Sequence, residues 1–225
     1  GASLCSITHN TIYQNDVVGY GGGQIALQDH VSSTVIEHNI IVANPSTRQL
    51  IQLPGGTGSY AINSIDWNLY SGATAASGVF MWRGAELFGL GSWRGSAGQD
   101  GHSLFADNPG FTDAAALDFT LSEQSVAVDR GDPDFAYDVG EADYYGRVRT
   151  HDARTDIGMS EFGAIQAQGP TVETREATNI TYSTATISGT IVPGPNGATV
   201  WFEYGTTAIY GKKTAVQVLP AGGEP

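Results

Sequence analysis

The chain has 225 residues, a net charge of −13, 30 glycines and only 15% charged residues, a composition that favours turn-rich β-structure over helices with charged faces. This length allows one large all-β unit or two domains, with a sizeable buried core. Because Asp and Glu number 23 against 10 Lys and Arg, and because no apolar stretch is long enough to cross a bilayer, we expect neither a nucleic-acid partner nor membrane insertion.

A repeat of 29 residues occupies the first part of the chain. Its motif reads ITHNTI from Ile7, IEHNII from Ile36 and IDWNLY from Ile65. Residues with β-preference at this fixed period, rather than apolar residues at helical spacing, predict a β-solenoid in which each repeat forms one coil. Further short strands are expected inside the coils, at 24–28, 50–53 and 79–82.

The fourth residue of each motif is an asparagine: Asn10, Asn39 and Asn68. Asparagine tolerates left-handed or bridge backbone angles, so we expect it to form the corner of each coil. Stacked one strand spacing apart, about 4.8 Å, the three side chains would also form a hydrogen-bonded ladder that satisfies buried amides.

The motif I-x-x-N-x-I resembles that of right-handed parallel β-helix proteins of the pectin-lyase-like superfamily, over about residues 1–95. The next segment is similar to the C-terminal end of secreted bacterial β-helix proteins, in DNPGFTD at 107–113, DFTL at 118–121, SVAVDRGDP at 125–133 and DIGMSE at 156–161. The resemblance implies C-terminal coils and a closing segment of a right-handed parallel β-helix at 1–168, in an extracellular or cell-surface bacterial protein.

From residue 169 the pattern changes. Residues 184–192 and 198–204 alternate between apolar and polar around a Pro-Gly turn, which predicts a hairpin. This segment is similar to the first half of a bacterial fibronectin type III domain, which needs about seven strands and ~100 residues. We therefore expect a partial, antiparallel β-sandwich-like module at 169–225. Open ends of this kind predict either a piece of a longer secreted chain or self-association of copies end to end.

Two classes of function compete. The first is a non-catalytic extracellular structural or adhesive segment, which end-to-end assembly or glycan contact would serve. The alternative is a carbohydrate-active enzyme of the pectin-lyase-like type, either a polysaccharide lyase or a glycoside hydrolase. We favour the first, because the coils carry no Lys and no evident pair of carboxylates. His9 and His38 share a column with Trp67, which indicates a ladder of rings; a metal or catalytic pair is the alternative.

A polysaccharide is a candidate partner because sugar rings stack on exposed aromatic side chains. Glycines at 84, 89 and 91 predict a loop that leaves the coils close to several aromatic residues, and the alternative is a loop packed against the flank of the coils. The residues expected to contact a glycan are Tyr70, Trp82, Arg83 and Trp93.

Acidic residues gather in the middle of the chain, where residues 100–169 hold 14 Asp and Glu against 4 Arg. Oxygen ligands alternating with Gly and Pro are typical of a Ca²⁺ loop, although the strict D-x-D-x-D-G spacing is missing. The alternative is that these carboxylates bind turn amides and Arg147 or Arg149. No other cofactor is expected, and the single Cys5 excludes a thiolate metal cage. The candidate calcium ligands are Asp129, Asp132, Asp134, Asp138 and Asp143.

Overall fold

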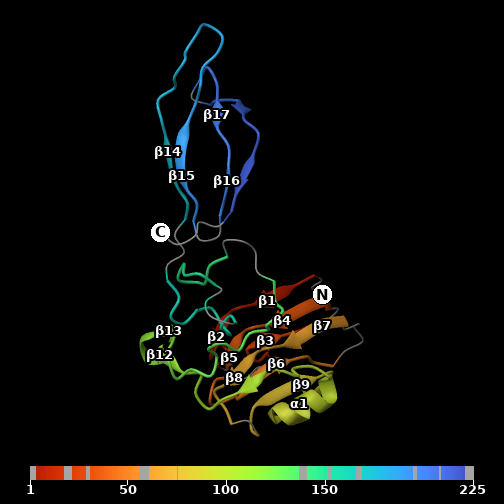
Figure 1. Ribbon diagram of the computed structural model, residues 1–225. Coiled ribbons are helices and arrows are strands. Elements are labelled where there is room, and N and C mark those ends of the chain that lie inside the picture. Colours follow the sequence, from red (N-terminus) through yellow and green to blue (C-terminus); the bar gives the residue numbers. More distant parts are fainter. Residues whose placement is uncertain are drawn as a thin grey trace. The chain divides into compact units, whose positions relative to one another are not determined.

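The computed structural model describes residues 4–17, 22–28, 31–55, 61–74, 76–136, 141–149, 151, 154–165, 169–194, 197–207 and 209–220. The chain divides into two compact units (Figure 1). The first comprises 1–136, 143–145 and 149–164, and the second comprises 137–142, 146–148 and 165–225. In the part that the structure describes, no helix is long and apolar enough to cross a membrane.

Three sheets of parallel strands form the frame of the first unit. In the first sheet, β4 (Ser32–Glu37) lies between β1 (Ser6–Thr8) and β7 (Ala61–Asp66). The second sheet has the order β11 (Leu104–Phe105), β8 (Leu69–Ser71), β5 (Ile40–Val42) and β2 (Thr11–Tyr13). The third contains β3 (Ile25–Ala26), β6 (Gln49–Gln52) and β9 (Val79–Trp82), followed by the antiparallel β10 (Ala85–Phe88).

Apart from β11, the strands of the first two sheets pair at the spacing of the sequence repeat. Ile7 pairs with Ile36, and Ile36 pairs with Ile65. Each motif therefore lies directly beside the motif that follows it. The prediction of an all-β chain with parallel strands first and antiparallel strands later is confirmed at this level.

The central strands β5 and β8 of the second sheet are buried on both faces, which explains their runs of apolar residues. Ile41 and Tyr70 face an inner core that all three sheets share. Ile40 and Leu69 face the other side, where Ile157 of the closing segment covers them. Every residue of β5 and β8 is buried, in contrast to the alternation expected of a sheet with one wet face.

Where a loop was predicted after residue 83, the chain folds back as β10 and then forms the helix α1 (Gly89–Ala97). Leu90 and Trp93 of this helix are buried in the inner core. The prediction of a loop that leaves the coils is wrong, because these two apolar side chains hold the insertion against the sheet.

The closing segment begins with the hairpin of β12 (Phe111–Asp113) and β13 (Asp118–Leu121), which a short 3-10 helix at Ala114–Ala116 connects. Its later part bonds back to the coils, since the amide of Gly158 donates to the carbonyl of His38 at 2.7 Å. Gly158 has a φ of 103°, and a Cβ there would lie 2.7 Å from Ile40 Cδ1. Only glycine fits this position without displacing a neighbour.

The second unit contains antiparallel strand pairs. β14 (Thr171–Thr174) pairs with β15 (Gly189–Val192), and β16 (Ala198–Val200) pairs with β19 (Gln217–Leu219). β17 (Glu203–Tyr204) pairs with β18 (Lys212–Lys213).

The predicted hairpin of 184–192 with 198–204 is wrong, because β15 pairs with the strand before it rather than with β16. A polar turn closes this earlier hairpin: Thr181 Oγ1 accepts the amides of Ser183 and Thr184 at 3.2 and 2.9 Å. Turns made by Ser and Thr hydroxyls are a weaker sequence signal than Pro-Gly turns. For this reason the sequence predicted the hairpin turn at 193–197.

Candidate functional site

Equivalent residues of successive coils form columns along the sheets. A fourth coil continues the first three at 100–105: the amide of Asp100 donates to the carbonyl of Ile65 at 2.6 Å, and Leu104 pairs with Leu69. In this coil Ser103 occupies the place of the motif asparagine. The step from Asn68 to Ser103 is 35 residues, so the repeat of 29 does not reveal it. β10 and α1 lie in this interval, where the preceding repeats have a strand of the first sheet.

The asparagine column is a continuous hydrogen-bonded ladder. Asn39 Oδ1 accepts from Nδ2 and from the backbone N of Asn10, at 3.2 and 3.0 Å. Asn68 Oδ1 accepts from the same two groups of Asn39, at 3.1 and 3.0 Å. Ser103 Oγ ends the ladder by accepting from the backbone N of Asn68 at 2.8 Å. The side chains of Asn39 and Asn68 are fully buried and are not available to a ligand.

The left-handed corner lies one residue earlier than predicted. His9, His38 and Trp67 have φ angles of 55°, 58° and 52°. The asparagine that follows each of them fixes this corner by hydrogen bonds instead of adopting the left-handed angles itself.

The histidine column forms a stack of rings inside the unit. The rings of His9 and His38 lie 4.6 Å apart and are parallel within 3°, and Phe135 contacts both by its edge. The backbone N of Asp132 donates to His38 Nε2 at 2.9 Å. Burial, the largest cause, lowers the pKa of His9 to about 3 and that of His38 to about 4. Both rings are therefore neutral at physiological pH and serve as packing groups.

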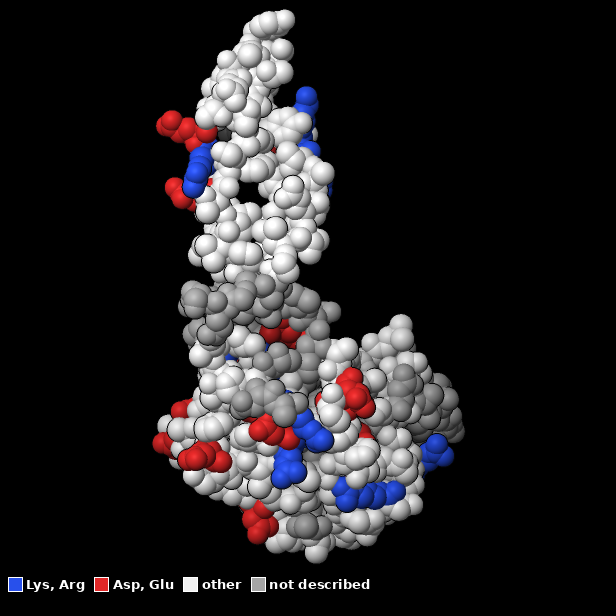
Figure 2. Space-filling view, viewed as in Figure 1, with Lys and Arg blue, Asp and Glu red and all other residues white. Residues whose placement is uncertain are grey.

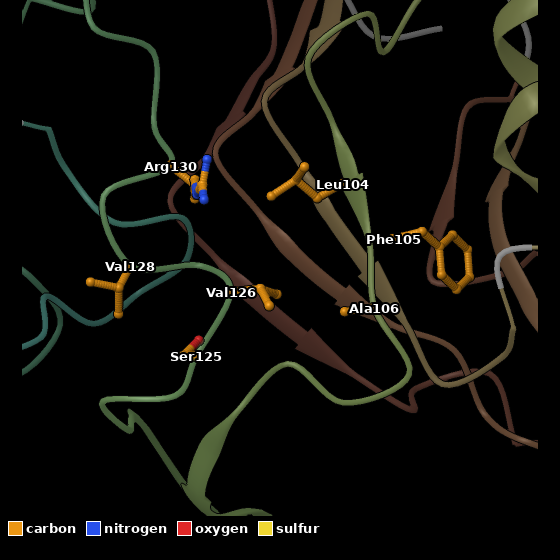
Figure 3. A pocket seen from close by; sticks show the side chains of 7 residues that line it. All are labelled: Leu104, Phe105, Ala106, Ser125, Val126, Val128 and Arg130. Carbon is orange, nitrogen blue, oxygen red and sulfur yellow. The ribbon is translucent and has the colours of Figure 1, made fainter.

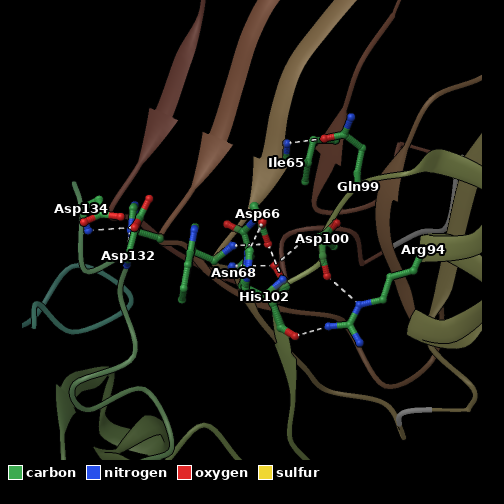
Figure 4. Close-up of polar contacts among 12 residues, drawn as sticks. Ile65, Asp66, Asn68, Arg94, Gln99, Asp100, His102, Asp132 and Asp134 are labelled. Atoms are coloured by element: carbon green, nitrogen blue, oxygen red, sulfur yellow. Dashed lines mark hydrogen bonds and ion pairs between the residues drawn. The ribbon is translucent and has the colours of Figure 1, made fainter.

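At the exposed end of this column, Asp66 and His102 form a close pair (Figure 4). Asp66 Oδ2 lies 2.8 Å from His102 Nδ1, and Asp66 Oδ1 accepts from the backbone N of His102 and of Trp67 at 2.7 and 2.9 Å. The imidazole stacks on Trp67 with the ring centres 4.3 Å apart. The side chain of His102 is 62% exposed, whereas that of Asp66 is 20% exposed.

This geometry suits proton transfer. A carboxylate bonded to Nδ1 fixes the tautomer and orientation of an imidazole, and leaves Nε2 toward a ligand. Glu37 adds a second carboxylate, because it pairs in register with Asp66 on the neighbouring strand. Residues in register on parallel strands share a face about 4.8 Å apart.

These three residues are absent from the set that sequence reasoning selected. The sequence does contain a signal for the carboxylate pair, because the second position of the motif holds Glu37 and, one repeat later, Asp66. His102 gives no comparable sign, because it belongs to the coil that the insertion displaces.

Two of the four residues expected to contact a glycan lie in the core. Tyr70 and Trp93 are fully buried, and both donate to the carboxylate of Asp100, from Tyr70 Oη at 3.0 Å. Burial raises the pKa of Asp100 to about 6, while Ser103 and the two aromatic donors oppose the rise. Their ring faces pack against Phe80 and other core residues, which leaves no room for a sugar.

The other two, Trp82 and Arg83, reach the surface at the turn between β9 and β10. The guanidinium of Arg83 lies 5.6 Å from the centre of the Trp82 ring. Trp82 is partly buried and contacts Trp93 by its edge. This pair offers a small aromatic and cationic surface rather than the four-residue cluster predicted.

The carboxylates of the acidic run bond to backbone amides. Asp132 Oδ1 accepts from the N of Asp134 at 2.9 Å, and Asp143 accepts from the N of Tyr145 and of Glu161, both at 2.9 Å. Asp129 lies in the same segment, with a left-handed φ of 54°. Asp138 lies outside the described residues. Among the described residues, no three His, Cys, Asp or Glu side chains are placed to hold a metal ion.

We expect millimolar Ca²⁺ to leave the melting temperature of the chain unchanged, because backbone amides already bond to Oδ1 of Asp132 and to both carboxylate oxygens of Asp143. On the face shown in Figure 2, acidic and basic side chains are also interspersed over the first unit. The measurement is differential scanning fluorimetry with Ca²⁺, with Mg²⁺ as control, and with EDTA. A rise specific to Ca²⁺ that Asp132→Asn removes would contradict this expectation.

Comparison with known proteins adds one relative. The chain is 32% identical over 127 residues to the uncharacterized protein YwoF of Bacillus subtilis (strain 168), a match that covers 56% of this chain. The match spans about a quarter (26%) of the length of that curated relative. No protein-family model matches the chain, and no solved structure matches it.

Proposed function

We propose that the first unit is the C-terminal part of a right-handed parallel β-helix, and that the second is a partial fibronectin type III-like module. The parallel register at the period of the repeat and the asparagine ladder support the first assignment. The succession of antiparallel strand pairs supports the second. Together they form a non-catalytic structural or adhesive segment of a secreted or cell-surface bacterial protein.

The observation that carries this proposal is that three sets of polar and aromatic groups of the repeats are committed to internal contacts. The asparagine ladder, the stacked His9 and His38, and the Asp100 carboxylate with its donors are all directed inward. Side chains that bond to the backbone of the neighbouring strand hold the strands together and leave few of these groups for chemistry, which suits a supporting or adhesive role. Copies of the chain, the rest of a longer protein and polysaccharides are the partners that this role would serve.

The second candidate function is that of a carbohydrate-active enzyme, and the exposed pair of Asp66 and His102 favours it. In this function His102 would act as general base or acid, Asp66 would orient its ring, and Glu37 would supply the second carboxylate.

A turnover assay separates the two functions. The purified chain is incubated with a panel of acidic and neutral polysaccharides, and unsaturated uronates and reducing ends are measured. For a structural segment we expect no release above that of the heat-denatured chain.

Turnover that falls by about 10²-fold or more in His102→Ala, yet is unchanged in Glu123→Gln at an exposed position away from the pair, would overturn the structural proposal. Asp66→Asn distinguishes a catalytic pair from a contaminant, because it keeps the side-chain volume and changes only the partner of Nδ1. Thermal denaturation of each variant shows whether its fold is intact.

A further inference from the structure

The second sheet ends in an open strand edge. β11 is the outermost strand, and its inner side bonds to β8 through the amides of Leu104 and Ala106, which donate to Asn68 and Tyr70 at 2.8 and 3.0 Å. Peptide groups of successive residues in a strand point to opposite sides, so the N–H and C=O of Phe105 point away from β8. In the part of the chain that the structure describes, neither group has a partner.

A groove lies against this strand (Figure 3). Its volume is about 430 Å³, and its other wall is formed by the closing segment from Ser125 to Arg130. Leu104 and Ala106 lie on the side of β11 that faces this wall, while Phe105 points the other way. Val126, which is 42% exposed, supplies apolar surface from the opposite wall.

We propose that this groove binds an extended peptide segment of another protein, which adds to β11 as the next strand of the sheet. The unpaired peptide groups of Phe105 require a ligand with its own donor and acceptor at strand spacing, as a polypeptide has. Leu104, Val126 and Val128 require apolar side chains at alternate positions of that peptide.

The charge of the groove further restricts the kind of peptide that can bind. Arg130 is the one charged residue in its lining, and it forms no ion pair with the residues that the structure describes. In a chain of net charge −13, an exposed and unpaired guanidinium is a local site for a carboxylate. The peptide that fits therefore carries an acidic residue beside its apolar run. This inference stands apart from the structural and the enzymatic proposals.

The test uses a synthetic peptide with the sequence EHNIIVAN of residues 37–44, blocked at both ends and labelled with a fluorophore. This peptide stands in for the strand of the partner. In the chain itself Ile40 and Val42 lie on the face of the sheet that Leu104 shares, so the peptide has apolar side chains at the required alternate positions. We expect saturable binding by fluorescence anisotropy, and slower hydrogen exchange of the Phe105 amide in the complex. The same peptide with N-methyl groups at those two positions cannot donate to β11 and should not bind.

Val126→Asp places a charge on the apolar wall at an exposed position and should weaken peptide binding by at least about tenfold. Leu117→Asp is the matched control, because Leu117 is 69% exposed, lies outside the groove and has a left-handed backbone that Asp tolerates. Binding that survives N-methylation or Val126→Asp, or that leaves the Phe105 amide unprotected, would overturn the proposal. So would absence of binding at millimolar peptide. A larger species in light scattering that Val126→Asp dissociates would show a second copy in the groove, and would overturn it as well.

Discussion

Replacing Asn39 with alanine is expected to lower the free energy of unfolding of the first unit by about 3 to 4 kcal/mol. Asn39 is fully buried in the middle of the ladder. Its side chain accepts from the backbone N of Asn10 and donates to the carbonyl of Ile7 and to Asn68 Oδ1. Alanine removes all of these bonds at once and leaves backbone groups without partners, at about 1 to 3 kcal/mol for each buried one.

Asn10→Ala is the matched control within the same column. Asn10 is exposed, and its side chain donates only to Thr8 O and to Asn39 Oδ1. Water can replace these bonds, so we expect a loss of about 1 kcal/mol or less. Urea denaturation of both variants, followed by tryptophan fluorescence, gives the comparison, because Trp93 is fully buried in the first unit. Equal losses in the two variants would contradict the idea that the buried middle of the ladder holds the coils together.

The parallel strand pairing of the motifs could be predicted because their isoleucine and asparagine repeat at a fixed spacing. The pairing of Ile7, Ile36 and Ile65, the asparagine contacts and the stacking of His9 on His38 all follow from this step of 29 residues. The fourth coil lies beyond the reach of this reasoning, because Ser103 replaces Asn and the step grows to 35. His102, which completes the exposed pair, lies in that coil.

Burial is the part of the site that sequence alone could not decide. An aromatic residue next to glycines is equally consistent with an exposed sugar platform and with a core side chain. Tyr70 and Trp93 are in the core because Asp100, a single carboxylate of a left-handed corner, gives both polar ends a partner there. The sequence of the acidic run is likewise consistent both with a calcium site and with carboxylates that bond to turn amides. In the structure the carboxylate of Asp143 accepts a hydrogen bond from the backbone N of Glu161.

The second large effect that we expect is a loss of stability when buried Glu161 is deprotonated. Glu161 is 1% exposed, and burial together with the nearby charge of Asp156 raises its pKa to about 8; the amide of Asp156 and Arg149 oppose the rise only in part. In the unfolded chain the group has its ordinary value of 4.5. The folded state thus binds this proton more tightly than the unfolded state, so the stability gained from it is complete below pH 4.5 and is lost as pH rises through 8.

Between pH 6.5 and 8, Glu161 is the main described group with a shifted pKa that changes the free energy of unfolding. Asp156 and Asp100 also have raised pKa values, of about 6, so their losses of stability are largely complete below that range. His9 and His38 have lowered pKa values; they destabilise the fold only as pH falls below their unfolded value of 6.5. Across the remaining 1.5 units, Glu161 alone predicts a fall in the free energy of unfolding of about 2 kcal/mol, at about 1.4 kcal/mol for each unit.

Glu161→Gln should abolish this fall, because glutamine keeps an oxygen that can accept the amide of Asp156 and carries no charge to bury. At pH 8.5 we expect the variant to exceed the wild type by about 4 kcal/mol in free energy of unfolding, at about 1.4 kcal/mol for each unit between pH 5 and the pKa of about 8, and to differ from it by about 1 kcal/mol or less at pH 5. Urea denaturation at several pH values between 5 and 8.5 measures both, with the exposed Glu123→Gln as control. If the wild-type fall above pH 6.5 persists in Glu161→Gln, the proton that the fold retains lies on another group, and Asp156→Asn, tested in the same way, would show whether it is shared with that neighbour.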